Sequence, residues 1–259
     1  MLTLQLLSKK FSRLREFLNI SISIIGGAML YKFLGDVAHN DRDFKTLEQE
    51  KIHASHFSSL NDPWDAPNNF LDPSVIERLS NSPAKKLADD FFYDINNFGI
   101  YCLSTEKSSQ LMWAHYANNW KGLCIEYNAP DPGKFFYKLR EIHNSMVLIS
   151  ALSMRYADFP LYADIEDFKK ENALNLIRKL FSQKNVAWSY EKEFRLFFKK
   201  SQQYHIPASL VSGVYLGHAM AAAQKEKYLA MLSGKKIPVW IAYPDKANFR
   251  GGVRVERLG

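Results

Sequence analysis

The sequence contains few cysteines and none of the common motifs for nucleotide binding. Its two cysteines, Cys102 and Cys124, are too few for a disulfide framework and lack the spacing of metal ligands. We therefore expect a reducing, cytoplasmic setting in which both are buried small side chains. No GxxxxGK[ST], GxGxxG or GxSxG pattern occurs, which excludes the commonest phosphate-binding and serine-hydrolase signatures.

The chain also lacks a long apolar run and any low-complexity segment. The apolar stretch ISISIIGGA at residues 20–28 is interrupted by serines and is well short of the roughly 20 residues that a membrane-spanning helix needs. We therefore expect no stable membrane insertion. With 47% hydrophobic and 14% aromatic residues, the 259-residue chain has enough apolar material for a substantial core.

The net charge is positive. Lysine and arginine number 34 against 27 acidic residues, which gives +7 and a pI near 9.2. Residues 1–28 carry four basic residues and one acidic residue, so +3 of this charge belongs to that segment. An excess of positive charge favours a polyanionic partner, such as nucleic acid or an anionic cofactor.

The patterning predicts an α+β chain with two parts. Residues 1–28 form an N-terminal extension, either a helix or a non-native start that precedes Met29, and residues 29–259 form a single catalytic-type domain. Short strands mix with helices of unequal length, which favours α+β over a regularly wound α/β sheet. Strands are expected at 51–57, 99–104, 123–128, 190–198 and 239–244, and helices at 43–49, 74–97, 109–118, 164–187 and 221–232, with Thr105 or Ser108 as the cap of the third helix.

The segment YEKEFRLFF at residues 190–198 carries the strongest chemical signal. Alternate side chains of a strand share a face, so Glu191, Glu193 and Arg195 would point one way and the apolar residues the other. Two carboxylates and a guanidinium on one surface can shift a carboxyl pKa or hold one carboxylate while the other acts on a substrate. The alternative is a solvent-facing strand with an ordinary row of surface charges.

Two further segments add polar side chains. On a helix, His115 and Tyr116 of LMWAHYAN can contact a ribose or phosphate, and neighbouring aromatic residues such as Trp113 can stack on a base. The alternative is an aromatic core helix with a satisfied histidine. In NDPWD, Asn61 and Asp62 stand in a proline-fixed turn that can bind a hydroxyl or a cation, although such sequences are often only turns.

Five blocks together resemble a widespread bacterial family that is named as a domain of unknown function. They are LYKF, SSLNDPWD, GIYCLS, LMWAHYANNWKGLCIEYN and WSYEKEFRLF. Their layout is more distantly similar to ADP-ribosyltransferase folds, especially the DNA-modifying DarT-like toxins. That resemblance implies an ADP-ribosyltransferase-like single domain of short mixed strands with flanking helices.

The resemblance also implies roles for individual residues. Glu193 stands where the catalytic glutamate lies, Glu191 would orient or deprotonate the acceptor, and Arg195 would fix either carboxylate. Lys32 stands where those enzymes place arginine or histidine, which is a departure because lysine lacks the planar fork of arginine. The NAD-binding set is Tyr31, Lys32, Asn61, Asp62, Ser104, Trp113, His115 and Tyr116, with no metal.

The implied activity is transfer of ADP-ribose from NAD to nucleic acid or protein, as a toxin or an antiphage defence protein with a neutralising antitoxin-like partner. One alternative is a non-catalytic module that binds a nucleotide or nucleic acid. Another is a hydrolase of nucleotides or nucleic acid that holds a divalent cation with Asp62, Asp65 and Glu193.

Overall fold

The structure is a computed structural model that describes most of the chain from residue 29 onward. The described residues are 29–35, 42–81, 95–129, 131–144, 147–168, 173–248 and 252–258, together with Lys85, Asp89 and Tyr93. The predicted N-terminal extension, residues 1–28, lies outside them. Among the described helices, none has the length and apolar character needed to cross a membrane.

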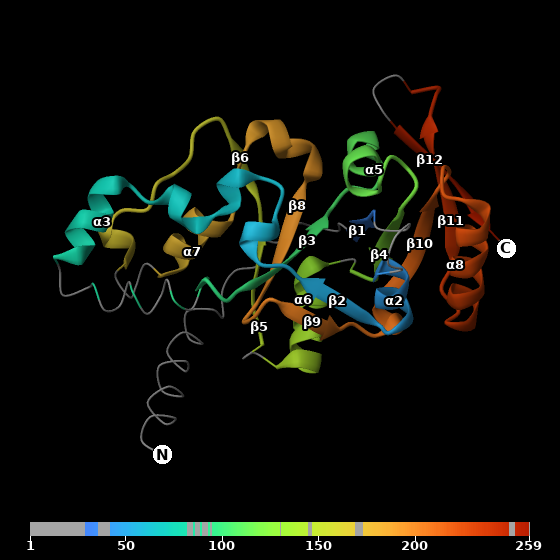
Figure 1. Cartoon of the computed structure of the whole chain (residues 1–259), viewed down its shortest axis with the longest axis horizontal. Helices are drawn as coiled ribbons and strands as arrows, with labels where there is room; N and C mark the ends of the chain where they lie inside the picture. The colour runs from blue at the N-terminus through green and yellow to red at the C-terminus, as the bar shows by residue number, and fades with distance from the viewer. Residues whose placement is uncertain are drawn as a thin grey trace, which may run out of the picture.

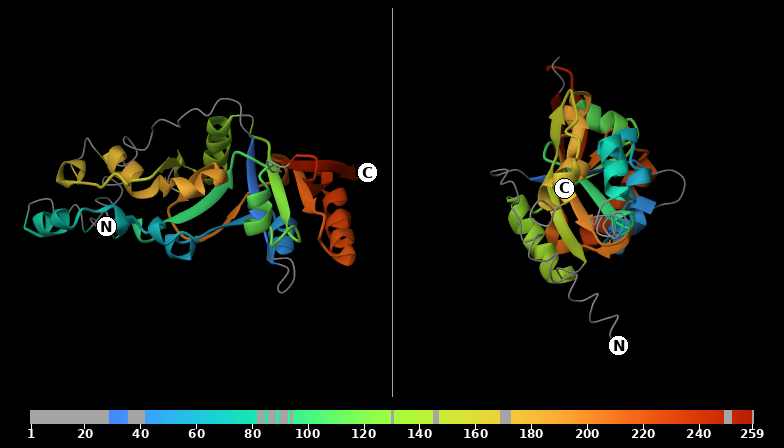
Figure 2. Two further views of the ribbon diagram at one scale, coloured as in Figure 1. Left: turned by 90° about the horizontal axis from the view of Figure 1, so that it is seen from above. Right: turned by 90° about the vertical axis from the view of Figure 1, so that its left-hand side faces the viewer.

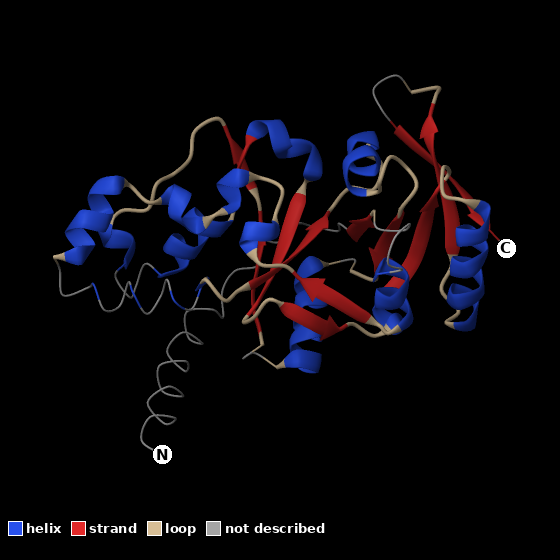
Figure 3. Cartoon of the chain, in the orientation of Figure 1, coloured by secondary structure: helices blue, strands red, loops and turns tan. Residues whose placement is uncertain are grey.

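An eight-stranded sheet runs through the molecule (Figures 1 and 3). Its spatial order is β12-β11-β10-β4-β1-β3-β8-β5, and its described pairs are antiparallel except for β10 with β11. The strands are β1 (Leu30–Leu34), β3 (Gly99–Ser104), β4 (Leu123–Tyr127), β5 (Leu148–Ser153), β8 (Glu193–Phe198), β10 (Val211–Gly217), β11 (Val239–Asp245) and β12 (Gly252–Leu258).

One face of this sheet is covered by three helices. They are α2 (Arg42–Glu48), α6 (Pro132–His143) and α8 (Ala222–Gly234). Their apolar side chains, such as Phe44, Phe135 and Leu232, pack against Phe194, Leu196 and other alternate residues of the strands. A two-stranded sheet of β2 (Lys51–Ala54) and β9 (Gln202–His205) adds to the same core. This face is therefore a closed apolar layer.

The opposite face of the sheet is covered in two parts. The polar side chains of the candidate site, described below, lie between these parts. Helix α5 (Gln110–Tyr116) packs on β1 through Met112 and Trp113. At one end of the elongated molecule, α3 (Pro73–Ser80) and α7 (Ala173–Phe181) lie together and form a second apolar cluster with residues such as Phe70 and Phe197 (Figure 2). Short 3-10 turns connect these helices to the sheet.

The α+β prediction is confirmed, and the strand at 99–104 has the predicted bounds. Several predicted elements differ. The strand expected over 51–57 ends at Ala54, and residues 57–59 form a 3-10 turn. In the region of the helix expected over 74–97, α3 ends at Ser80. Residues 186–191 form a 3-10 turn because Asn185 accepts a hydrogen bond from Ala187 N, so the strand expected at 190 begins at Glu193. The helix expected over 164–187 is split into η4 (Ile165–Phe168) and α7, and β7 (Gln183–Asn185) pairs in parallel with β6 (Arg155–Ala157). The cap of α5 is Ser109, which accepts from Met112 N, and not Thr105 or Ser108.

Candidate functional site

A row of four side-chain positions crosses the centre of the sheet beside α5. Glu126 of β4 is paired with Tyr31 of β1, Tyr31 with Ser104 of β3, and Ser104 with Glu193 of β8. Paired residues of neighbouring strands point to the same face. Three positions predicted from the sequence, Tyr31, Ser104 and Glu193, therefore share this row although they are far apart in the chain.

At the β8 end of the row, Glu193 and Arg195 form a buried ion pair. Arg195 donates from Nε to Glu193 Oε1 at 2.8 Å and from Nη2 to Oε2 at 3.0 Å, and its Nη2 also donates to Asp65 Oδ1 at 2.6 Å. Arg195 is 1% exposed and Glu193 is 6% exposed. The alternative of a solvent-facing row of charges is thus wrong, because both side chains are enclosed, and Arg195 Nη1 also donates to the carbonyl of Phe181 in α7 at 3.4 Å.

Lys184 of β7 joins three carboxylates in the same cluster. Its Nζ lies 2.6 Å from Glu191 Oε2, 3.2 Å from Glu193 Oε2 and 3.9 Å from Asp65 Oδ2. All of these side chains are buried. Three acidic and two basic groups give this ionic network, defined as Asp65, Lys184, Glu191, Glu193 and Arg195, a formal charge of −1.

The two carboxyl groups that bind Arg195 are held in different electrostatic states. Burial alone would raise the pKa of Glu193, but the charges of Arg195 and Lys184 outweigh it and lower that pKa to about 2. At Asp65 burial outweighs the same two cations, so its pKa is raised. Asp65 Oδ2 has no hydrogen-bond partner among the described residues, which agrees with weaker compensation there. Glu193 is therefore the firmly ionised member of the pair.

Glu191 is the carboxylate that connects the network to the surface. The hydroxyl of Tyr116 donates a short hydrogen bond to Glu191 Oε1 and accepts one from Asn61 Nδ2 at 2.6 Å. Burial and this contact raise the pKa of Tyr116. Asn61 is exposed and Tyr116 half-buried, so one aromatic side chain separates Glu191 from solvent.

Aromatic residues and a histidine surround this point. His115 Nδ1 lies 3.0 Å from the hydroxyl of Tyr190, and Tyr190 lies against Trp188 with ring centroids 6.2 Å apart. Lys184 Nζ lies 5.0 Å from the centre of the Trp188 ring. His115 is exposed, whereas both aromatic rings are half-buried. The site thus has a buried ionic interior and an aromatic rim, defined as His115, Tyr116, Trp188 and Tyr190.

Local sequence explains how these groups meet. Asp62 caps the 3-10 turn η2 (Pro63–Asp65) by accepting from Trp64 N, and that turn points Asp65 inward. Lys192 adopts a left-handed conformation with φ 43° between the 3-10 turn and β8. This turn of the backbone lets Glu191 and Glu193 both reach Lys184 although they do not belong to one strand. Ser104 Oγ donates to the carbonyl of Glu191 at 2.7 Å and supports that junction.

Three residues predicted for the NAD site, Lys32, Trp113 and Tyr31, make their main contacts outside the ionic network. Lys32 lies on the opposite face of β1, where its Nζ donates to the carbonyl of Cys102 at 3.0 Å and sits 4.8 Å from the centre of the Tyr101 ring. Trp113 is 1% exposed and packs against Phe33 and Trp120.

Tyr31 lies on the site's face but toward Glu126, at the other end of the row. There Glu126 accepts from Lys107 Nζ at 3.1 Å and from the Tyr215 hydroxyl at 2.8 Å. Burial and the charge of Glu126 raise the pKa of Tyr31. This group forms a second, half-buried polar cluster, and no hydrogen bond or ion pair between the described residues joins it directly to the ionic network.

Lys184 and the rim residues Trp188 and Tyr190 were not predicted as site residues. Lys184 lies inside the predicted helix, where a lysine is normally solvated, and only its position in the short strand β7 turns it inward. Asp65 was predicted to contribute to a turn that binds a hydroxyl or a cation, and it instead binds Arg195. No group of three or more His, Cys, Asp or Glu side chains arranged to hold a metal occurs in the described part of the chain.

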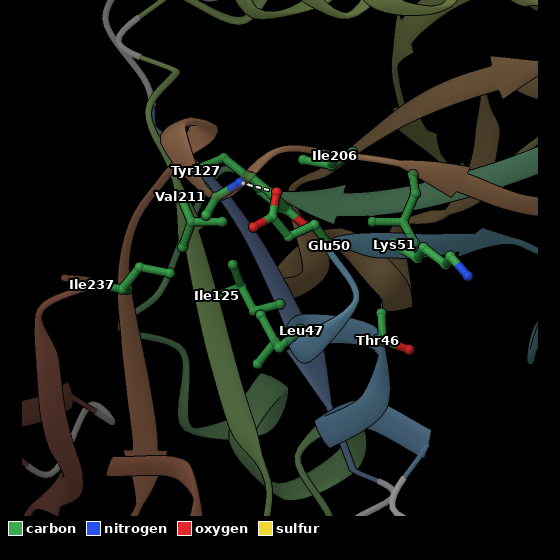
Figure 4. Close-up of a pocket in the computed structure, with 11 residues that line it drawn as sticks. Thr46, Leu47, Glu50, Lys51, Ile125, Tyr127, Ile206, Val211 and Ile237 are labelled. Carbon is green, nitrogen blue, oxygen red and sulfur yellow. Dashed lines mark hydrogen bonds between the residues drawn. The ribbon is translucent and has the colours of Figure 1, made fainter. Parts of the chain in front are cut away.

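A crevice on the other face of the sheet does not compete with this site (Figure 4). It lies among Leu47, Ile125, Ile237 and neighbouring apolar residues, and Glu50 at its edge accepts a hydrogen bond from Ala208 N. Its volume is about 20 Å³, which is room for about one water molecule. The crevice is therefore a packing feature of the core.

Comparison with known proteins gives a partial family match and no activity. Residues 112–196, about a third of the chain, match the model of the family described as "Protein of unknown function (DUF2971)", so this segment is similar to a family of unknown function. The match begins within α5 and ends within β8, so it includes the rim, Lys184, Glu191, Glu193 and Arg195. No curated protein and no solved structure gives a significant match to the chain.

Proposed function

We propose that this protein, whose residues 112–196 match a family of unknown function, is an enzyme that cleaves the nicotinamide–ribose bond of NAD. The ADP-ribose is transferred to a nucleic acid or a protein. The observation that carries the proposal is the contact between Glu191 and Tyr116. Glu191 already accepts a hydrogen bond from a hydroxyl on its solvent side. A ribose hydroxyl is a donor of the same kind, so it can take the place of the tyrosine hydroxyl.

The reaction needs a carboxylate at this place. When the bond between ribose C1′ and the nicotinamide nitrogen breaks, the bonding pair leaves with nicotinamide and positive charge develops on the ribose. A fixed carboxylate next to the ribose stabilises that charge. The acceptor atom then bonds to C1′ and releases its proton, which His115, an exposed base on the rim, can accept.

The aromatic rim suits the two ring systems of NAD. Tyr116, Trp188 and Tyr190 present half-buried rings around Glu191, and such rings stack on flat heterocycles. In this proposal Glu191 contacts the substrate, whereas Glu193 and Arg195 position it through Lys184 and the β8 backbone. Lys32 takes no part, because it lies on the other face of β1.

The experiment is incubation of the purified chain with isotope-labelled NAD and separate RNA, DNA and protein acceptors, without added metal. The proposal expects nicotinamide release and label on one acceptor class, and Glu191→Gln should lose both. Glu256→Gln is the matched control, because Glu256 is an exposed glutamate on β12. Intact NAD after long incubation with folded protein would reject the proposal.

A second candidate is a non-catalytic module that binds nucleotides. The observation that favours it is that both oxygens of Glu193 are ion-paired and buried, so this carboxylate is not open to a substrate. The two functions differ in one measurement. A module would bind NAD or nucleic acid equally well with Glu191→Gln and would release no nicotinamide.

A further inference from the structure

A groove is formed by residues of two segments, 64–72 and the loop around Tyr162. It is lined by Trp64, Asn69, Leu71, Asp72 and Tyr162 and has a volume of about 250 Å³. Pockets for whole small-molecule ligands usually span roughly 300–1,000 Å³. The groove therefore fits one side chain or one ring, and it is too small for a dinucleotide.

The groove has exposed aromatic walls over a buried floor. Trp64 is 50% exposed and Tyr162 is 46% exposed, while Leu71 between them is 7% exposed. The Trp64 ring has one recorded ring neighbour, Phe70, with centroids 6.3 Å apart. Half of each wall is thus available to a flat or cationic group.

Asp72 gives the groove its charge. It is the one charged residue of the lining, and one of its carboxylate oxygens accepts a hydrogen bond from Ser74 N at 2.8 Å. The side chain of Ser74, together with its backbone N–H, lowers the pKa of Asp72, so the carboxylate is ionised at neutral pH. A phosphate or another anion would be repelled here, whereas a guanidinium or ammonium group would be attracted by both the carboxylate and the aromatic faces.

Each wall is linked to a residue that neighbours the ionic network in the sequence. Trp64 directly precedes Asp65, which binds Arg195. Tyr162 follows Leu161, whose N–H and carbonyl are both bound at 2.8 Å by the side chain of Gln183, the residue before Lys184.

We propose that this groove binds a cationic side chain of a polypeptide, arginine in preference to lysine, and that this polypeptide is the acceptor of the transferred group. The second clause rests on the proposed function. Arginine is preferred because its planar guanidinium stacks on aromatic faces and is less strongly hydrated than an ammonium. The bound residue is a docking residue, and the atom that accepts ADP-ribose lies elsewhere on the same polypeptide.

The test is direct binding without NAD. An acetylated, amidated peptide of alternating glycine and arginine is titrated into the full chain at low salt and followed by calorimetry, beside matched lysine and glutamine peptides and single-stranded oligothymidylate. We expect binding in the order arginine, lysine, then no binding of glutamine or oligothymidylate. Trp64→Ala or Tyr162→Ala should each weaken arginine-peptide binding about tenfold, and Trp64→Phe should retain most of it.

Two further variants are compared: one removes the charge of the groove, and the other is a control outside the groove. Asp72→Asn keeps the cap of α3, because asparagine caps as well as aspartate, but removes the charge and should weaken binding by about threefold. Tyr137→Ala removes an aromatic ring that is 56% exposed on α6, on the other side of the sheet, and should leave binding unchanged.

Three outcomes would overturn the inference: no binding of the arginine peptide, equal binding by Trp64→Ala, or Trp64-dependent binding of oligothymidylate in its place. Because NAD is absent, these outcomes are separate from those of the proposed function. If the chain binds the peptide through Trp64 but cleaves no NAD, the groove proposal is supported and the transferase proposal is rejected.

Discussion

Lys184 is the residue on which the ionic network depends most. It approaches Asp65, Glu191 and Glu193 within 4 Å, and without it three buried carboxylates would face the single charge of Arg195. Removal of one partner of a buried ion pair leaves an uncompensated charge in a poorly solvating interior. The same cost explains why the two carboxyl groups beside Arg195 shift their pKa values in opposite directions.

Replacement of Lys184 by methionine should therefore destabilise the fold by about 3–5 kcal/mol. The measurement is the free energy of unfolding from urea titration. Arg254→Met is the control, because the Arg254–Glu256 pair is exposed on both sides and such pairs contribute about 0–1 kcal/mol. Equal effects of the two substitutions would show that the network is solvated.

The lowered pKa of Glu193 predicts a specific acid dependence. Its folded pKa of about 2 lies below the ordinary value of 4.5, so folding favours the ionised form. The resulting stability is complete above about pH 4.5 and is lost as the pH falls toward 2, with a total of about 3 kcal/mol. Asp65 has a raised pKa and contributes with the opposite sign, since its burial cost disappears when it is protonated.

The check is the unfolding free energy of the parent and of Glu193→Gln between pH 6 and pH 2. The difference between the two proteins should shrink as the pH falls below the ordinary glutamate value. A difference that stays constant over this range would mean that Glu193 titrates normally in the folded chain.

At the scale of elements, the junction between the 3-10 turn at Val186–Glu191 and β8 decides the geometry of the site. Lys192 turns the chain with φ 43°, a conformation that costs most residues roughly 1–2 kcal/mol. Its side chain is largely exposed, and its Nζ lies 3.5 Å from Glu106 in a surface pair of little energetic value. Lys192 thus matters through its backbone.

Lys192→Gly and Lys192→Val separate the backbone effect from the side-chain effect. Both remove the surface pair, but valine resists a positive φ whereas glycine accepts it. We expect the valine variant to be about 1–2 kcal/mol less stable than the glycine variant, as measured by thermal and urea unfolding. Equal stability of the two variants would show that the left-handed turn is not retained in solution.

This junction also shows how far the sequence predicts the structure. Alternation correctly placed Phe194 and Leu196 on the apolar face and Glu193 and Arg195 on the other. Glu191 also lies with Glu193, as predicted, because both contact Lys184, but it does not belong to the strand. It ends a 3-10 turn that the left-handed Lys192 joins to β8, without a glycine to signal the break. Lys184 was not predictable from periodicity, since β7 is three residues long and its inward direction comes from pairing with β6.

At the scale of the whole molecule, the central sheet brings together segments that are distant in the sequence. The row from Glu126 through Tyr31 and Ser104 to Glu193 joins four strands, and the register that aligns them cannot be read from any local pattern. The strand order, with β1 between β3 and β4, was likewise not predicted. The composition predicted only the α+β class.

The accessibility of the two cysteine thiols shows whether this sheet is folded. Cys102 on β3 and Cys124 on β4 are free thiols, and burial raises the pKa of both, which suppresses the reactive thiolate. If β3 and β4 unfold together, both should be alkylated by iodoacetamide with the same denaturant midpoint, as followed by mass spectrometry. Labelling of one thiol well before the other would show that the sheet opens in parts.

The most direct test of the central claim compares Glu191→Gln with Glu193→Gln for nicotinamide release from NAD, alongside their unfolding free energies. The account predicts that Glu191→Gln stays folded and loses turnover by at least about 100-fold, within the range expected for a group that stabilises transition-state charge. Glu193→Gln should chiefly lose stability, and the fraction that remains folded should keep measurable turnover. Full turnover by Glu191→Gln, or no turnover by the well-folded parent chain, would contradict the account.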